Sequence, residues 1–390
     1  MQKPPRLLFL LVLGLFSVTA FWTPDVSAQN YRFRNRRQNT DSQTVSKDVQ
    51  SRSTNQKTQT PSPAPTPTPK KQNYALLIGI NQYTADTETM SRKSTDECGY
   101  LVFNSLRYCI ADMKGLRDAL LKGEYADPKN IILLTDDNES KALRPTYDNI
   151  VRYLNEINSK TKENDAVLIA FAGHGVALPG QSDQAQSYLC PMDAEVSRNT
   201  DSGEWNHDSL IPLSLLFKGS ETKKGVHKIA ILDACRNVGD VQGGGRNAIT
   251  LVRGSETQSL ELPNFQEYDL ARFKKLDRLA SCGEGQRAHE DPKLNHGVYS
   301  NFMIEGLQGK ADSDKNGEIT VQELTQYVAE ETKNYVQKTF RQEQSPTYSA
   351  SESETFVIAH CPKPRDDGGG GGGGGRIPPP PKPKPITNPK

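Results

Sequence analysis

Two reactive side chains follow two strongly apolar stretches of the sequence. His174 stands in Ala-Gly-His-Gly directly after residues 165–171, and Cys235 stands in Asp-Ala-Cys-Arg directly after residues 228–232. A cysteine becomes a nucleophile when its thiol loses its proton, and a histidine close by can accept that proton. The small residues beside both side chains leave room for a substrate backbone. Either residue alone would more often be structural, but the pair predicts a cysteine-histidine dyad.

Five short apolar runs have the composition of strands that are covered on both faces, because they are nearly continuous rather than alternating. They are Tyr74–Ile78, Asn130–Leu134, Asp165–Phe171, Lys228–Leu232 and Leu276–Ala280. Apolar residues at steps of three and four predict amphipathic helices over residues 106–120 and 147–157. The order predicts an α/β fold with a mostly parallel central sheet between helices. Because sites in such sheets lie at the carboxyl ends of the strands, His174 and Cys235 are expected at one edge.

Composition divides the chain into one folded block and two polar ends. Only 34% of the 390 residues are hydrophobic, and 48 basic side chains balance 47 acidic ones, so a nucleic-acid partner is not expected. Residues 29–73 are predicted to be a disordered Pro/Thr-rich linker, residues 74–361 one large domain of the size of a catalytic domain, and residues 362–390 a disordered Gly/Pro-rich tail.

The first 28 residues have the pattern of a signal peptide. Lys3 and Arg6 precede an apolar run over residues 7–18, and small residues lead to Ala28. The chain is therefore expected to be exported, with a secreted, periplasmic or cell-surface location. A membrane is an expected partner only if this segment stays uncleaved.

The stretch from Tyr74 to Ala359 resembles the caspase-like cysteine peptidases of peptidase family C14, which include caspases, metacaspases and bacterial relatives. The resemblance rests on the opening run Tyr-Ala-Leu-Leu-Ile-Gly-Ile-Asn and on the motifs around His174 and Cys235. It implies a caspase-like α/β/α sandwich and an endopeptidase that acts on proteins or peptides and requires no cofactor for its chemistry. In such an enzyme Cys235 attacks the scissile carbonyl, His174 protonates the leaving amine, and the backbone N–H groups of Gly175 and Cys235 form the oxyanion hole.

Two acidic residues carry the expected substrate preference. Asp233 stands two residues before the nucleophile, where caspases have Gln, and Asp112 matches the acidic residue that metacaspases place on their first helix. Two carboxylates attract a basic side chain and repel an acidic one, so the resemblance predicts cleavage after Arg or Lys. The other interpretation of Asp233 is that it orders the nucleophile loop by accepting backbone N–H bonds.

The stretch from residue 237 to residue 273 is rich in glycine and is predicted to be an exposed loop. It contains Arg246 and Arg253, which are candidate sites of self-cleavage, although the loop can equally remain uncut. Ala172 stands where metacaspases usually have Ser, and Asp193 is followed by Ala194 instead of a second aspartate. A metacaspase calcium site is therefore not expected.

Residues 312–323 match the calcium loop of an EF-hand. Asp312, Asp314, Asn316 and Glu323 occupy ligand positions of that loop, and Gly317 stands at its sharp turn. Thr-x-x-Glu at residues 320–323 is also a capping box, so the segment can instead be a turn between two helices. The sequence leaves calcium binding open.

A catalytically silent binding or scaffold protein on the same fold is the competing interpretation. Such proteins usually lose the histidine or the cysteine, and this chain keeps both. The remaining histidines have no partner at a useful spacing and are predicted to have surface or packing roles: His207, His227, His289, His296 and His360.

Overall fold

The computed structural model describes residues 71–179, 185–234, 249–259, 262–263, 265, 270–283, 286–350 and 356–362. Nearly all of the predicted signal segment and linker and the tail from residue 363 lie outside these ranges, as do Cys235 and Arg246. The proposed domain boundaries therefore stay predictions. Within the described ranges, no helix combines the length and the apolar composition that crossing a bilayer requires.

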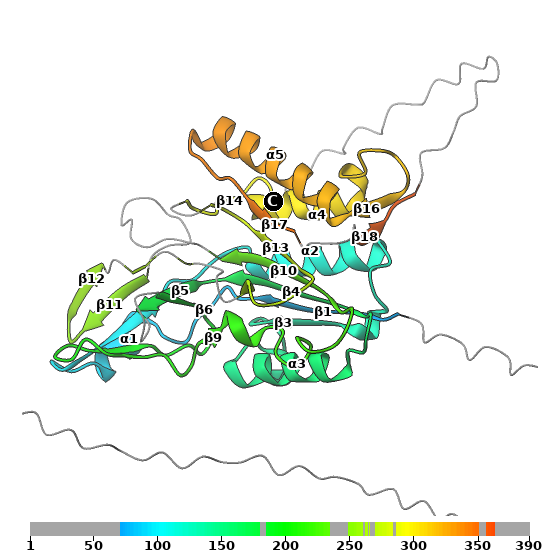
Figure 1. The fold of residues 1–390 in the computed structure, drawn as a ribbon. Helices are drawn as coiled ribbons and strands as arrows, with labels where there is room; N and C mark the ends of the chain where they lie inside the picture. The colour runs from blue at the N-terminus through cyan, green and yellow to red at the C-terminus, as the bar shows by residue number, and fades with distance from the viewer. Residues whose placement is uncertain are drawn as a thin grey trace, which may run out of the picture. The chain divides into compact units, whose positions relative to one another are not determined.

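A six-stranded sheet forms the centre of the folded block (Figure 1). Its strand order is β17-β13-β10-β4-β1-β3. Five strands are parallel, and the edge strand β17 is antiparallel to β13. The five predicted strands and the mostly parallel sheet are confirmed, and β17 was not predicted. The bounds are β1 Asn73–Gly79, β3 Ile131–Thr135, β4 Ala166–Gly173, β10 His227–Ala234, β13 Leu276–Ala280 and β17 Thr347–Ser349.

Helices cover both faces of this sheet, which confirms the α/β/α sandwich (Figure 1). Helix α2 (Cys109–Lys122) packs on β1 and β4, and α4 (Val298–Glu305) and α5 (Val321–Phe340) pack beside it on the same face. Helix α3 (Tyr147–Lys160) packs on the opposite face. The start of α3 is fixed by the Thr146 side chain, and the start of α5 by a full capping box between Thr320 and Glu323.

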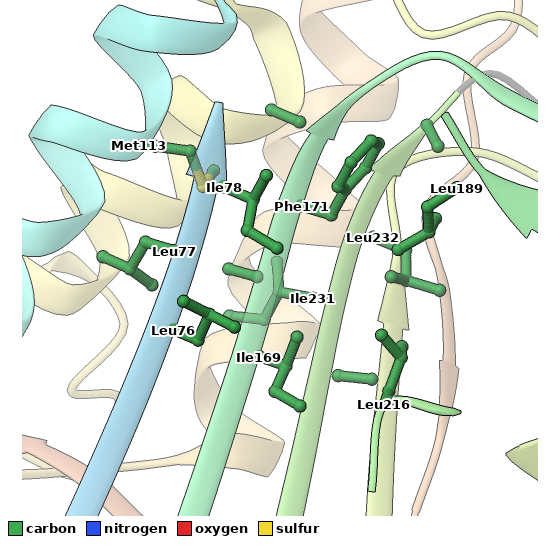
Figure 2. Packing of buried hydrophobic residues seen from close by; sticks show 14 of the residues in the cluster. Leu76, Leu77, Ile78, Met113, Ile169, Phe171, Leu189, Leu216, Ile231 and Leu232 are labelled. Atoms are coloured by element: carbon green, nitrogen blue, oxygen red, sulfur yellow. The ribbon is translucent and has the colours of Figure 1, made fainter. Parts of the chain in front are cut away.

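The inner strands are buried along their length, as continuous apolar runs require. Every residue of β4 and β10 is buried. Figure 2 shows Ile78, Phe171 and Ile231 among the buried hydrophobic side chains that pack along the strands of the sheet. Each fully buried side chain of this size contributes about 1.5–3 kcal/mol. The sheet is therefore a rigid base for the residues at its edge.

Smaller antiparallel sheets begin where the central strands end. One has the order β12-β11-β2-β7-β8 and another the order β5-β6-β9. None of their strands was predicted, and β11 and β12 lie in the stretch that was expected to be a loop. The bounds are β2 Cys98–Phe103, β5 Gly175–Pro179, β6 Ala185–Leu189, β7 Ser197–Asn199, β8 Trp205–Asn206, β9 Ile211–Pro212, β11 Ile249–Arg253 and β12 Glu256–Ser259.

The remaining elements are short. Strands β14 and β15 pair with each other, and β16 pairs with β18. The bounds are α1 Thr87–Lys93, β14 Glu290–Asp291, β15 His296–Gly297, β16 Glu318–Thr320, β18 Val357–His360, the single-turn segments Pro128–Asn130, Lys141–Leu143 and Leu213–Leu215, and the π-helical segment Gly306–Lys310.

Candidate active site

The register between β4 and β10 brings the two motifs to one edge of the sheet. Asp233 pairs with Ala172, and Ala234 pairs with Gly173. Strand β10 therefore delivers the chain to position 235 at the edge where His174 lies. Cys235 itself is outside the described residues.

Gly175 lies directly against the end of β10. A Cβ atom at this position would be 3.2 Å from the Cβ of Ala234 and 2.8 Å from the ring of Phe265. Because real Cβ contacts are not that short, only glycine fits here without a shift of its neighbours. This close approach brings the backbone of the predicted oxyanion-hole residue to the strand that precedes Cys235.

The imidazole of His174 is buried, with 1% of the residue exposed. Its Nε2 atom lies 2.7 Å from the carbonyl oxygen of Asn104. A carbonyl oxygen only accepts, so Nε2 carries the hydrogen, and in the neutral ring Nδ1 is the nitrogen able to take a thiol proton. The rings of Tyr83 and Phe103 lie 4.9 Å and 5.8 Å from the imidazole, measured between ring centres. The histidine is thus held in one tautomer within an aromatic environment.

The backbone of His174 is held as firmly as its ring. Its N–H donates to the hydroxyl of Tyr83 at 2.7 Å, and its carbonyl accepts the N–H of Cys190 at 3.0 Å. A Cβ atom at Gly173 would lie 2.9 Å from the Tyr83 hydroxyl and 2.8 Å from the ring of Phe171. These contacts explain why glycine precedes the histidine.

Both predicted pocket carboxylates are buried and contact the start of α4. Asp112 is 0% exposed, and its Oδ1 atom accepts bonds from Nδ1 of His296 at 2.9 Å and from the N–H of Gly297 at 3.0 Å. Asp233 is 1% exposed and accepts the Ser300 hydroxyl at 2.8 Å. Gly297 caps α4 and Ser300 lies in its first turn. The N-terminal end of a helix attracts negative charge, so one helix end holds two carboxylates that are far apart in the sequence.

The prediction that the remaining histidines lack a partner is wrong for four of them, and two of these four contact carboxylates. His296 contacts Asp112, and Nε2 of His227 lies 2.6 Å from the carboxylate of Asp277 near the opposite end of β10. Both partners lie on other elements of the fold, so no local spacing could have indicated them. Two features near His174 were also missed. The Asn104 carbonyl is a main-chain group without a sequence signal, and Tyr83 was indicated only by its position just after the first strand.

Arg253 does not lie in an open loop, so the predicted loop is wrong for residues 249–259. Strand β11, which ends at Arg253, is paired with β12 on one side and β2 on the other. Arg253 pairs with Glu256 across a two-residue turn, and their charged groups are 3.8 Å apart. Cleavage after Arg253 therefore requires this hairpin to open. Arg246 lies outside the described residues.

The predicted calcium loop brings three carboxylates together. Ligand atoms of Asp312, Asp314 and Glu323 lie within 4.8 Å of one another. The loop turns at Gly317, where φ is 84°, and the N–H groups of Asn316 and Gly317 donate to Asp312 at 3.1 Å and 3.0 Å. Carboxylate oxygens that converge in this way are ligands of the kind that calcium takes, so the described residues fit that ion.

Hydrogen bonds within the loop favour the charged carboxylates. Desolvation opposes ionisation of Asp312, but bonds from the Cys361 thiol and from backbone N–H groups together hold its pKa below the usual value. Desolvation also opposes ionisation of Glu323, but hydrogen bonds from Thr320 and Ser313 outweigh it and hold the pKa of Glu323 below its usual value. The loop thus presents ionised oxygens at neutral pH.

Residues 72–357 match the family model of peptidase C14, described as the caspase domain. Metacaspase-1 of Eremothecium gossypii is 29% identical over 168 residues, which cover 42% of this chain and 31% of that protein. Metacaspase-1B of Aspergillus clavatus is 27% identical over 189 residues, which cover 47% of this chain and 41% of that protein. The aligned segments span less than half the length of these curated relatives.

Among solved structures, caspase-1 from Spodoptera frugiperda aligns with a TM-score of 0.44 and 12% identity, over 75% of this chain and 93% of that chain. The family match covers most of the chain, including His174, the described end of β10 and the position of Cys235. The chain therefore belongs to the caspase-domain family, peptidase C14.

Proposed function

We propose that this protein is a cysteine endopeptidase that cleaves proteins or peptides after Arg or Lys. The observation that carries the proposal is the tautomer of His174, which lies at the edge of the sheet where β10 ends. Because Nε2 already carries a hydrogen, Nδ1 is the nitrogen that can accept a proton from a thiol. Membership in the peptidase C14 family supports the same reaction.

In the proposed reaction the thiol of Cys235 gives its proton to Nδ1 of His174, and the thiolate attacks the scissile carbonyl carbon. The N–H groups of Gly175 and Cys235 stabilise the negative oxygen that forms. The imidazolium then protonates the amine as the C–N bond breaks, which leaves a thioester on Cys235. Water gives a proton to His174 and attacks the thioester, and the released sulfur recovers a proton.

The preference for a basic residue is supported by the two buried carboxylates that share the start of α4. Asp112 and Asp233 reach the same helix turn through Gly297 and Ser300. An Arg or Lys head group about 4 Å from one carboxylate gains about 4 kcal/mol at an effective dielectric of 20, before desolvation is subtracted, and an aspartate is repelled by a similar amount.

The test is turnover of matched peptides that end in Arg, Lys or Asp at the scissile bond, with wild type and Cys235→Ala. We expect cleavage after Arg and Lys by wild type only. Cleavage by Cys235→Ala would contradict the nucleophile, and cleavage after Asp would contradict the pocket. Binding of peptides without turnover would instead favour the scaffold interpretation.

We also propose that the chain is exported through its first 28 residues and cleaves itself after Arg246. The basic and apolar pattern of the N-terminus supports export, and the glycine-rich sequence around Arg246, between Cys235 and β11, supports an accessible bond. N-terminal sequencing of the secreted wild type beside Cys235→Ala tests both. Fragments that appear in both proteins would indicate another protease, and retention of residue 1 would contradict signal cleavage.

We further propose that Asp312, Asp314, Asn316 and Glu323 bind calcium, which steadies the helices on either side of the loop and takes no part in the chemistry. The close approach of the three carboxylates of this set, those of Asp312, Asp314 and Glu323, supports the site. Calorimetry tests it, since even weak extracellular sites have Kd values of about 10⁻⁴ to 10⁻³ M. No heat of binding at millimolar calcium would exclude the site.

A further inference from the structure

Tyr83 contacts His174 in two ways at once. Its hydroxyl accepts the backbone N–H of His174 at 2.7 Å, and its ring lies 4.9 Å from the imidazole with an interplanar angle of 46°. The backbone bond fixes the peptide plane at the point where β4 ends, and the ring contact limits rotation of the imidazole. One side chain therefore restrains both the main chain and the ring of the histidine.

Tyr83 is itself immobilised by the residues beside it. The carboxylate of Asp136, just after β3, accepts the N–H groups of Asn81 at 2.7 Å and Gln82 at 3.1 Å. On the other side of Tyr83, the N–H of Thr84 donates to the carbonyl of Met192 at 2.9 Å. Burial raises the pKa of Tyr83 well above its usual value of 10, so its hydroxyl stays neutral across the working range of a peptidase.

The same turn also holds the second partner of His174. The side chain of Asn81 donates to the carbonyl of Arg107 at 3.0 Å and accepts the N–H of Ile110 at 3.3 Å, and its own carbonyl accepts the N–H of Leu106 at 2.7 Å. These bonds anchor the segment that carries the Asn104 carbonyl, the acceptor of the Nε2 hydrogen. The turn over residues 81–83 thus restrains His174 from two sides.

We propose that Tyr83 is a positioning residue for His174, which keeps the imidazole in the orientation that proton transfer with Cys235 requires. This inference rests on the proposed function, in which His174 is the base. Tyr83 acts through its contacts with the backbone and ring of His174. Because a displacement of about 1 Å at a reacting group can cost about 100-fold in rate, a restraint of this kind affects turnover more than substrate binding.

The test is Tyr83→Phe, which removes one buried oxygen and keeps the ring. The backbone N–H of His174 then loses its acceptor, and the histidine becomes less well held. We expect kcat to fall about tenfold with KM unchanged within about twofold. We also expect the pH profile of Cys235 alkylation by iodoacetamide to shift to higher pH, since a loosely held imidazolium stabilises the thiolate less.

Tyr125→Phe is the matched control. Tyr125 is also buried, at 3% exposed, and its hydroxyl donates to the Tyr74 carbonyl at 3.4 Å, near the other end of β1. We expect this variant to lower Tm while kcat and the alkylation profile stay those of wild type.

The outcomes separate the inference from the proposed function. Tyr83→Phe with the kcat and alkylation profile of wild type would overturn the inference, as would an equal loss of kcat in both tyrosine variants. A wild-type protein without Cys235-dependent turnover would instead overturn the proposed function. The alkylation profile still reports whether Tyr83 acts on the cysteine-histidine pair in that case.

Discussion

Replacing Asp233 by Asn tests the charge of the proposed specificity pocket with little change in shape. The amide oxygen of Asn can still accept the hydroxyl of Ser300, which Asp233 accepts at 2.8 Å, so the contact with α4 is retained. The negative charge is removed, and one carboxylate oxygen becomes an amide NH2 group. The comparison therefore separates the electrostatic role of Asp233 from a role in ordering the chain.

The size of the effect follows from Coulomb's law. A guanidinium about 4 Å from one carboxylate gains about 4 kcal/mol at an effective dielectric of 20, and desolvation reduces that gain. Since each 1.4 kcal/mol is about a factor of ten, kcat/KM for Arg peptides is expected to fall between about 10-fold and 1000-fold. Asp112 remains in place, so some preference for a basic residue should persist.

The assay compares two peptides that differ only at the residue before the scissile bond, with Arg in one and citrulline in the other. Citrulline has the shape of Arg without its charge. Wild type should strongly prefer Arg, and Asp233→Asn should show a much smaller preference. Asp277→Asn is the control, because Asp277 is also a buried aspartate but lies near the other end of the sheet, bonded to His227 and Tyr348. An unchanged preference in a folded Asp233→Asn would refute the pocket assignment.

Three further predictions concern the thiols and the calcium loop. Iodoacetamide at pH 8 should label Cys235 well before Cys361, because burial and the bond to Asp312 raise the pKa of Cys361 to about 11, and equal labelling would contradict an activated nucleophile. Calcium at about 1 mM should raise Tm by about 3–6 °C if Kd is about 10⁻⁴ M. Glu323→Gln can keep the capping box but should abolish this rise in Tm. An equal rise in both proteins would contradict the site. The pKa values of Asp312 and Glu323 lie below their unfolded values of 3.8 and 4.5, so their contribution to stability is present above those values and is lost as pH falls through the folded pKa values. Between pH 5 and pH 3 the Tm of calcium-free wild type should therefore fall more than the Tm of Glu323→Gln. An equal fall in both proteins would refute this prediction.

The sequence predicts the central sheet well because its strands are covered on both faces. Runs such as residues 166–173 are buried at every position, and such strands are visible without knowledge of their partners. Short strands such as β2 and β17 depend on pairing with distant segments and have no comparable pattern. Their local composition could not have distinguished them from loops.

The candidate site divides in the same way. His174 was identified as a candidate because it follows a strand within a recognisable motif, and Asp112 because it matches an acidic residue on the first helix of metacaspases. The interactions that hold them could not be identified, since the Asn104 carbonyl belongs to the main chain and His296 is 184 residues away from Asp112. Sequence spacing indicates which groups take part, and the fold decides what they contact.

The separation of these partners along the chain also bears on how the protein acquires its site during folding. Asp112 lies on α2, Asp233 ends β10, and both meet α4, with sequence separations of 185 and 67 residues in the bonds to Gly297 and Ser300. Contacts of such high contact order form slowly, because the entropy of closing long loops is lost before the contacts stabilise the chain. On a ribosome, α4 emerges well after the segment that carries His174 and Cys235. A nascent chain therefore contains the two proposed reacting residues before it contains the helix that completes the surroundings of the two carboxylates.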